Sequence, residues 1–231
     1  ASLTGGVAAN IFTVKGWNGN ATLNGVGGNE TFNIYLDGIG TGTITVSDSA
    51  LLSSNDVLNL FNSATTTITA SQLKVAAQVI NYSSIKNLNI DGAVAGLTYN
   101  IQSTNSATTT IINPPTSGAA NIFNLGSTAG INPAQPGTLD GLLGELILNG
   151  SGNDVLNVDD SGNPIGRTVT LLYSFLFSNV GTINFNGIVR LNIALGQGND
   201  LFTIENTFAS ASTSPVIVIN GNGGADVFNV F

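Results

Sequence analysis

Cysteine, histidine and methionine are all absent from this chain of 231 residues. Without cysteine it can hold neither a disulfide framework nor a thiolate site. Histidine is the side chain most often used for acid–base catalysis near neutral pH, so its absence removes the commonest catalytic group. No initiator methionine or signal peptide opens the sequence at Ala1, and we therefore expect a processed form or a fragment.

Charged side chains are scarce and mostly acidic. They make up 8% of the chain, with five Lys and Arg and a formal net charge of −8, against roughly 25% in ordinary soluble domains. Nucleic acid is therefore not expected as a partner, because phosphate binding needs clustered basic residues. The longest apolar run, 171–180, contains polar residues and is much shorter than the about 20 residues that span a bilayer. We expect no membrane insertion.

Glycine and asparagine are abundant, and they gather in a short cassette that recurs along the chain. Its clearest copy reads GSGNDVLNV at 150–158, where a glycine-rich turn delivers a carboxylate, Asp154, to a short strand. A unit repeated this often predicts a solenoid, because each copy buries its apolar side chains only by stacking on the next. The other copies are GQGNDLFTI at 196–204, GNGGADVFNV at 221–230, GVGGNETFNI at 25–34, SSNDVLNL at 53–60, and two copies without the acid, at 5–14 and 118–125.

The hydrophobic pattern has the period of a β-strand. Asn or Thr repeatedly stands between two apolar residues, as in 32–34 (FNI) and 156–158 (LNV). Alternation places the apolar pair on one face and the central residue on the other, and we expect the central asparagines to face outward and to form hydrogen-bonded ladders. Residues 71–79 and 140–146 favour at most short helices. Further strands are expected at 43–46, 66–69, 109–112, 146–149, 169–172 and 216–220.

The fold class that follows is all-β, a single-stranded parallel β-helix (β-solenoid), right-handed, with few or no helices. A longer repeat lies above the cassette, since 80–90 (INYSSIKNLNI) matches 183–193 (INFNGIVRLNI) at an offset of 103 residues. We expect one continuous solenoid over 1–231, made of a partial repeat at 1–46 and copies at 47–146 and 147–231. No cap is visible at either end, so the chain is either a slice of a longer repetitive protein or a unit whose ends stack on neighbouring copies.

The cassette resembles the calcium-binding nonapeptide of RTX (repeats-in-toxin) proteins, GGxGxDxUx. Residues 149–157 (NGSGNDVLN), 195–203 (LGQGNDLFT) and 221–229 (GNGGADVFN) each depart from it at one of the first two glycines. In that family, turn carbonyls and the aspartate coordinate calcium between consecutive turns. The resemblance implies calcium as a cofactor, with Asp154, Asp200 and Asp226 as ligands and Asp159 beside the first of them. The alternative is that these acids only bond the backbone of their own turns.

The function expected first is that of a non-enzymatic structural protein of an extracellular fibre, a biofilm matrix or a cell surface. The chain is similar to long repetitive β-solenoid proteins of bacterial surfaces and matrices, and each coil offers the next the same interface, so its partners would be copies of itself, end to end. An alternative is an adhesin module, stabilised by calcium, that binds glycan or a host surface through the loops at 113–117 and 127–138. A polysaccharide-active enzyme is the second alternative. We assign it no catalytic residue, because the acids belong mostly to repeated turns and the cations are scattered.

Overall fold

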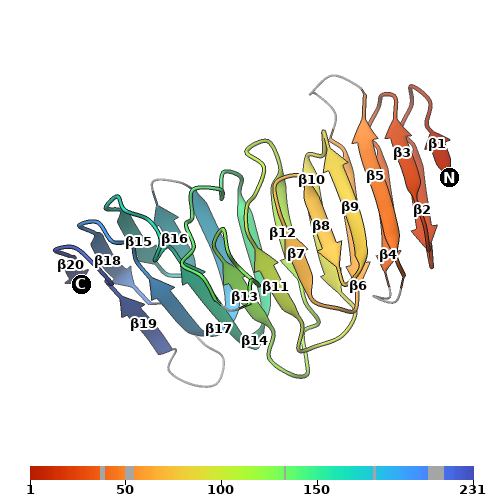
Figure 1. The fold of residues 1–231 in the computed structure, drawn as a ribbon. Helices are drawn as coiled ribbons and strands as arrows, with labels where there is room; N and C mark the ends of the chain where they lie inside the picture. Colours follow the sequence, from red (N-terminus) through yellow and green to blue (C-terminus); the bar gives the residue numbers. More distant parts are fainter. Residues whose placement is uncertain (37–39, 50–54, 133, 179–180, 208–215) are drawn as a thin grey trace.

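The computed structural model describes residues 1–36, 40–49, 55–132, 134–178, 181–207 and 216–231. Over these residues the protein forms twenty β-strands and no helix, and the strands join in one sheet with mostly parallel pairing. The body is long, and the two termini lie at its opposite ends (Figure 1). The described part contains no helix of a length and apolarity that would cross a bilayer. The expected all-β, largely parallel architecture is confirmed.

Successive strands alternate between two rows, which we call row A and row B. In spatial order, row A contains β1 (Ser2–Thr4), β3 (Ala21–Gly25), β5 (Gly42–Asp48), β9 (Gln78–Ser83), β8 (Gln72–Val75), β7 (Thr66–Ile68), β11 (Thr98–Ile101), β13 (Ile122–Leu125), the second halves of β14 (Leu146–Asp159) and β17 (Thr182–Ala194), and β19 (Val216–Asn220).

Row B is built in the same way from the remaining strands. It contains β2 (Ile11–Lys15), β4 (Thr31–Leu36), β6 (Val57–Asn62), β10 (Asn87–Gly92), β12 (Thr109–Asn113), the first halves of β14 and β17, β16 (Phe175–Ser178), β15 (Thr168–Leu172), β18 (Leu201–Asn206) and β20 (Val227–Val230). We call one strand of row A, the turn after it and the next strand of row B a rung.

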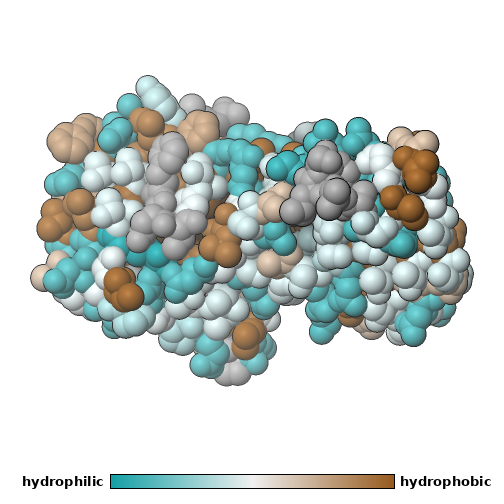
Figure 2. Space-filling model, turned by 90° about the horizontal axis from the view of Figure 1, so that it is seen from above, coloured by the Kyte–Doolittle hydropathy of each residue, from teal (hydrophilic) through white to brown (hydrophobic). Residues whose placement is uncertain are grey.

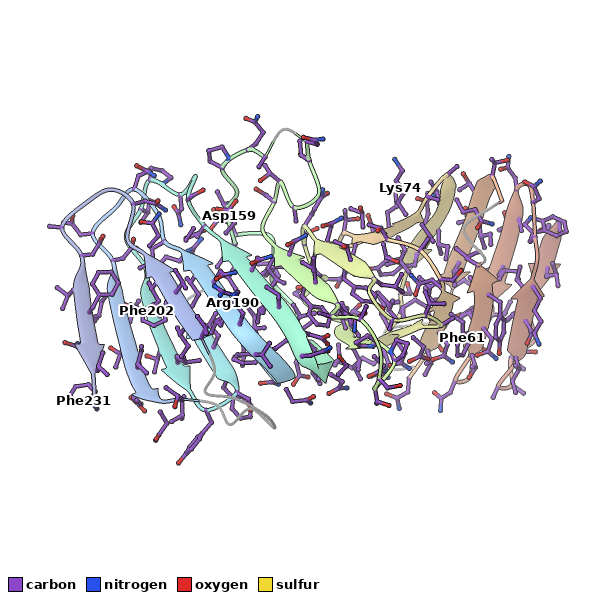
Figure 3. All side chains as sticks on the ribbon, turned by 90° about the horizontal axis from the view of Figure 1, so that it is seen from below. Phe61, Lys74, Asp159, Arg190, Phe202 and Phe231 are labelled. Atoms are coloured by element: carbon purple, nitrogen blue, oxygen red, sulfur yellow. The ribbon has the colours of Figure 1, made fainter. Side chains whose placement is uncertain are left out.

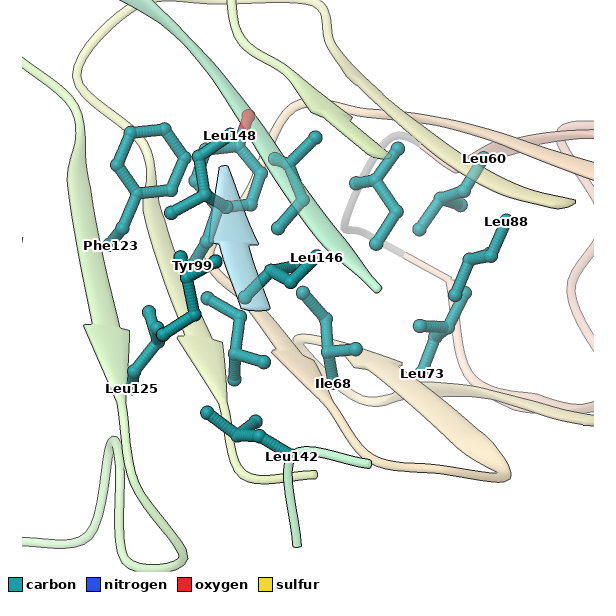
Figure 4. Close-up of a cluster of buried hydrophobic side chains, with 14 of the residues drawn as sticks. Leu60, Ile68, Leu73, Leu88, Tyr99, Phe123, Leu125, Leu142, Leu146 and Leu148 are labelled. Atoms are coloured by element: carbon teal, nitrogen blue, oxygen red, sulfur yellow. The ribbon is translucent and has the colours of Figure 1, made fainter. Parts of the chain in front are cut away.

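The hydrophobic core lies between the two rows. Strand alternation fills it: in β4, Phe32 and Ile34 are fully buried, whereas Asn33 between them is partly exposed. The buried residues form one cluster that extends from Phe12 to Phe202. Figure 4 shows Leu60 and Leu88 from row B near Leu73 from row A, so both rows contribute to the same core.

Two antiparallel meanders interrupt the alternation of rows. In the first, the chain runs ahead through β7, reverses in β8 and returns in β9 beside β5, which leaves β7 to pair later with β11. The second meander, β15–β16–β17, is built in the same way in row B. The segments 80–90 and 183–193, matched in the sequence, are the parts of the chain that leave these two meanders. Between the meanders the chain changes rows an odd number of times, so they lie in opposite rows.

All six further strands expected from the pattern are present, and the two segments in which at most short helices were expected contain none. Residues 71–79 form β8 and the start of β9, because Leu73 and Val75 are fully buried on either side of an exposed Lys74. This period of two outweighs the helix propensity of the residues. Residues 140–146 also lack a helix: Leu142 forms a single bridge with Thr104, and Leu146 begins β14.

Candidate functional site

The cassette turns lie where the chain passes from one row to the other. Five of them lead from row A into row B, before β2, β4, β6, β18 and β20, and two lead from row B into row A, before β13 and within β14. Neighbouring cassettes stack in register, as shown by the pairs Thr31↔Val57 and Leu201↔Val227, each directly after the acid position. Of the cassette at 53–60, residues 53 and 54 lie outside the described residues.

The acid of a cassette holds the turn of the neighbouring rung. One oxygen of Asp154 accepts the backbone N–H of Asn121 at 2.7 Å, and Asp226 accepts that of Asp200 at 2.9 Å. The same bond runs from Glu30 N to Asp56 (2.8 Å) and from Arg167 N to Asp200 (2.6 Å). A buried backbone N–H needs an acceptor, so this carboxylate ties consecutive turns together.

Asp154 and Asp159, two of the predicted calcium ligands, are both occupied by local donors. Asp154 is fully buried and also accepts bonds from the backbone N–H and the hydroxyl of Ser151, at 2.6 and 2.7 Å. Asp159 accepts the N–H groups of Gly137 and Ser161 at 2.9 and 3.0 Å. Each carboxylate therefore closes a turn or the base of a loop.

The structure does not bring the four predicted ligands together. Asp154 and Asp159 lie on β14, whereas Asp200 and Asp226 occupy the last two cassettes of the chain. Within the described ranges, three acids do lie close enough together to bind one ion, but none of them is a predicted ligand. Calcium at Asp154, Asp159, Asp200 and Asp226 stays a prediction.

That group is Glu30, Asp48 and Asp56, which the sequence reasoning missed. Their side chains are 0%, 5% and 0% exposed, and one oxygen of each lies within 4.8 Å of the others. Glu30 and Asp56 hold the acid positions of successive cassettes, so the sequence contained a signal for these two of the three residues. Asp48 joins them because β5 pairs in register with β3, which places it beside Gly25. Burial and the neighbouring Asp56 raise the pKa of Glu30.

A second pair of acids, the buried Asp160 and the exposed Asp140, is held by a buried cation. Asp160 and Asp140 both bond the guanidinium of Arg167, which is almost fully buried. Burial alone would lower the pKa of Arg167, but its hydrogen bonds to Asp160 and Asp140 raise it above the usual value. Arg167 therefore offsets part of the acidic charge of this group and fixes the turn after β14.

Asparagine ladders run along the outer faces of both rows, as expected from the alternation. In row B, Asn59 donates to Asn33 and Asn89 donates to Asn59, both at 2.8 Å. Each ladder satisfies polar side chains without charge. The others link Asn100, Asn124, Asn157 and Asn192 in row A, and Asp91, Asn113, Asn149 and Asn186 in row B.

A loop stands out from row A over one of these ladders. Figure 3 shows it beside Asp159, and a hollow of about 390 Å³ lies between it and the sheet, lined by Thr128, Ile131, Asn124 and Asn157 among others. This loop belongs to the predicted binding segment 127–138, of which residue 133 lies outside the described part of the chain. The second predicted segment, 113–117, leads from the end of β12 toward β13.

The two end rungs expose apolar side chains along open strand edges. Ile11 in β2 is 76% exposed and Val230 in β20 is 73% exposed. Figure 2, a view of the molecule from above, shows hydrophobic side chains in brown toward both of its ends. The other exposed apolar residues of these rungs are Leu3, Val7, Val216, Val218, Val227, Phe228 and Phe231.

Comparison with protein-family models, with curated proteins and with solved structures finds no match to this chain.

Proposed function

We propose that this protein is a structural, right-handed β-solenoid that polymerises end to end into a fibre of an extracellular matrix or a cell surface. In this proposal the rungs are the coils of the solenoid, and the protein has no enzymatic activity. The observation that supports it most is that the first and last rungs follow one plan and leave complementary edges open. The occupant of each edge is a second copy of this chain.

The two end rungs have the same spacing. Six residues separate Thr4, the end of β1, from Ile11, the start of β2, and six also separate Asn220 from Val227. If β1 of one copy pairs with β19 of another so that Thr4 lies beside Asn220, β2 then lies on β20 with Ile11 beside Val227. Both rows continue in one step, without a change in either turn.

The backbone bonds across this junction would repeat bonds already present within the chain. Val227 donates its N–H to the carbonyl of Asp200 at 2.8 Å, and Ile11 of the second copy is placed to donate to Asp226 in the same way. The cassette bond also has its partner, since Asn10 holds the acid position of the first rung. Its side-chain oxygen would accept the N–H of Asp226, as Asp226 accepts that of Asp200.

Side-chain packing continues across the same junction. The register places Phe228, exposed in the last rung, beside Phe12 of the second copy. Within one chain, Phe12 and Phe32 already stack in this way, with ring centroids 4.9 Å apart. Burial of the exposed apolar residues supplies the driving force. The low charge content makes the stacking nearly insensitive to salt, and the acidic surface opposes lateral clumping.

Electron microscopy and sedimentation of the purified chain test this proposal. The carbonyl of Asn10 faces β4, where it accepts the N–H of Thr31, so strand alternation points the N–H of Thr13 away from β4. Thr13→Pro removes this outward donor and is tolerated on an open edge. We expect filaments from the original chain, none from Thr13→Pro, and filaments again from Thr13→Val. Monodisperse particles of the original chain at high concentration contradict the proposal.

The hollow under the loop supports a second candidate, an adhesin module that binds glycan. Its lining offers amide and hydroxyl groups from Asn124, Asn157 and Thr128, which suit sugar hydroxyls. A glycan array probed with the chain, and with a variant in which 127–137 is replaced by a short Gly-Ser linker, tests this. Glycan binding that is unchanged in the variant excludes the hollow as the binding site.

A further inference from the structure

Glu30, Asp48 and Asp56 place three carboxylates together in the interior. They come from three different segments: the turn before β4, the end of β5 and the turn before β6. Asp56 and Asp48 are the charged groups that raise the pKa of Glu30, and no basic side chain is among the groups that shift it. This contrasts with Asp140 and Asp160, which both form ion pairs with Arg167.

A buried oxygen of this group is unused, which is a separate observation. Oε2 of Glu30 is shielded from solvent and has no hydrogen-bond partner. A buried carboxylate oxygen without a donor is costly, and such oxygens are normally paired or coordinate a metal. The other oxygen, Oε1, accepts a long hydrogen bond from the side-chain amide of Asn10, at 3.4 Å, and the Glu30 carboxyl also lies within hydrogen-bonding reach of Asp56.

A glycine lies directly against two of the carboxylates. A Cβ built on Gly25 would lie 2.8 Å from Cγ of Glu30 and 2.9 Å from Oδ1 of Asp48. Any side chain at position 25 would therefore push Glu30 and Asp48 out of their present positions. The positive-φ conformation that often requires glycine is not the reason here, because Gly25 is not among the residues with positive φ.

We propose that Glu30, Asp48 and Asp56 hold one calcium ion. Calcium lies about 2.3–2.6 Å from its oxygen ligands, so two oxygens on one ion are at most about 5 Å apart. The 4.8 Å limit within which the three oxygens lie fits this size. Calcium is favoured over magnesium because magnesium demands a near-ideal octahedral arrangement and dehydrates reluctantly, whereas calcium tolerates irregular sets of carboxylate oxygens. Water or bidentate carboxylates would complete the six to eight ligands that calcium takes. The site is independent of end-to-end stacking and uses none of the acids implied by the RTX resemblance.

Isothermal titration of the chelator-treated chain with calcium chloride, with thermal melting alongside, tests the proposal. We expect one equivalent of calcium to bind and the melting temperature to rise by about 5 °C in excess calcium. The double variant Glu30→Gln/Asp48→Asn should lose both responses. It should fold at least as well as the original chain without calcium, because it removes two like charges from the interior.

Two further variants make the test specific. Gly25→Ala should weaken calcium binding at least tenfold by displacing Glu30 and Asp48, whereas Asp226→Asn, at a cassette acid remote from the site, should leave it unchanged. The proposal is overturned if the original chain binds no calcium, if the double variant binds it as well as the original chain, or if binding is lost in Asp226→Asn. Equal stabilisation by magnesium chloride would overturn the assignment to calcium.

Discussion

At the scale of single residues, the cassette position that resembles a calcium ligand has a structural role in this chain. The same side-chain-to-backbone bond joins Asp56, Asp154, Asp200 and Asp226 to the turn of the rung before each of them. Asn121 shows that the charge is dispensable for this bond, since its side-chain oxygen accepts the N–H of Leu97 at 3.0 Å. The acid position could be found from the sequence, but its acceptor role required the register between rungs.

Substitution of the buried acid tests this role. Asp154→Ala leaves the buried N–H of Asn121 without its acceptor, and we expect it to lower the free energy of unfolding by about 2–4 kcal/mol. Asp154→Asn should lose less, because an amide oxygen can take over as it does at Asn121. Urea titration followed by circular dichroism measures both. Asp226→Ala, at the partly exposed last cassette, is the matched control and should lose less than about 1 kcal/mol. Equal losses at the two positions would contradict the structural role.

The buried acids around Glu30 give stability a pH dependence in the absence of metal. One oxygen of each of the three carboxylates lies within 4.8 Å of the others, so ionised carboxylates at these positions repel one another in the buried interior. Burial, together with Asp56 and Asp48, raises the pKa of Glu30 above 4.5 in the folded chain. The folded state then holds its proton more tightly than the unfolded state, so this contribution is complete below pH 4.5 and is lost as the pH rises through the folded pKa.

In chelator, therefore, the difference in melting temperature between Glu30→Gln and the original chain should grow in favour of the variant as the pH is raised from 4 to 7. Differential scanning calorimetry at several pH values measures this difference. Acids remote from Glu30 are the same in both chains, so the pH dependence that they contribute cancels in the comparison. A difference that is constant over this range would contradict the raised pKa.

At the scale of strands, alternation in the sequence predicted most of the elements but not their order in space. The strands that it missed are β1, β3, β8, β9, β11 and β16. Leu73 and Val75 follow the strand period, yet the surrounding alanines and glutamines resemble a helix, and burial decided between them. The meanders could not be predicted, because nothing local in β7 or β15 shows that the next strand reverses instead of changing rows. The offset of 103 residues did locate equivalent segments, since Ser84 and Gly187 both adopt positive φ where the chain leaves a meander.

This equivalence supplies a matched pair of substitutions. At Gly187, with φ of 65°, an added Cβ would lie 2.2 Å from the carbonyl oxygen of Gly150, and that oxygen is backbone that cannot move aside. We expect Gly187→Ala to cost about 3 kcal/mol or more in stability. Ser84→Ala, at the equivalent position, already has a Cβ and should change stability by less than about 0.5 kcal/mol. Thermal melting of both variants measures these losses of stability. Equal losses would contradict the steric role assigned to Gly187.

At the scale of the whole molecule, the chain is a stack whose ends resemble its interior. Natural edge strands are usually protected by charge, proline or a covering segment. Among the described residues, β19 and β20 contain neither a charged residue nor a proline. The sequence predicted that the cassette pattern would continue unbroken if the last cassette of one copy were followed by the first cassette of another. It could not predict that the six-residue spacing is equal in both rungs and aligns Asn10 with Asp226, because this required the register of the strands.

Cysteine cross-linking measures end-to-end register most directly, because the chain has no cysteine of its own. In the proposed junction, Asn229 of one copy lies beside Thr13 of the next, on outer faces of neighbouring parallel strands, within reach of a disulfide. The variant Thr13→Cys/Asn229→Cys should form, on mild oxidation, a ladder of covalent oligomers on a non-reducing gel. The control Thr13→Cys/Asn220→Cys puts the second cysteine in the other row and should form few. A ladder with the first pair alone is the predicted result, and equal or absent ladders from the two variants would contradict end-to-end stacking in this register.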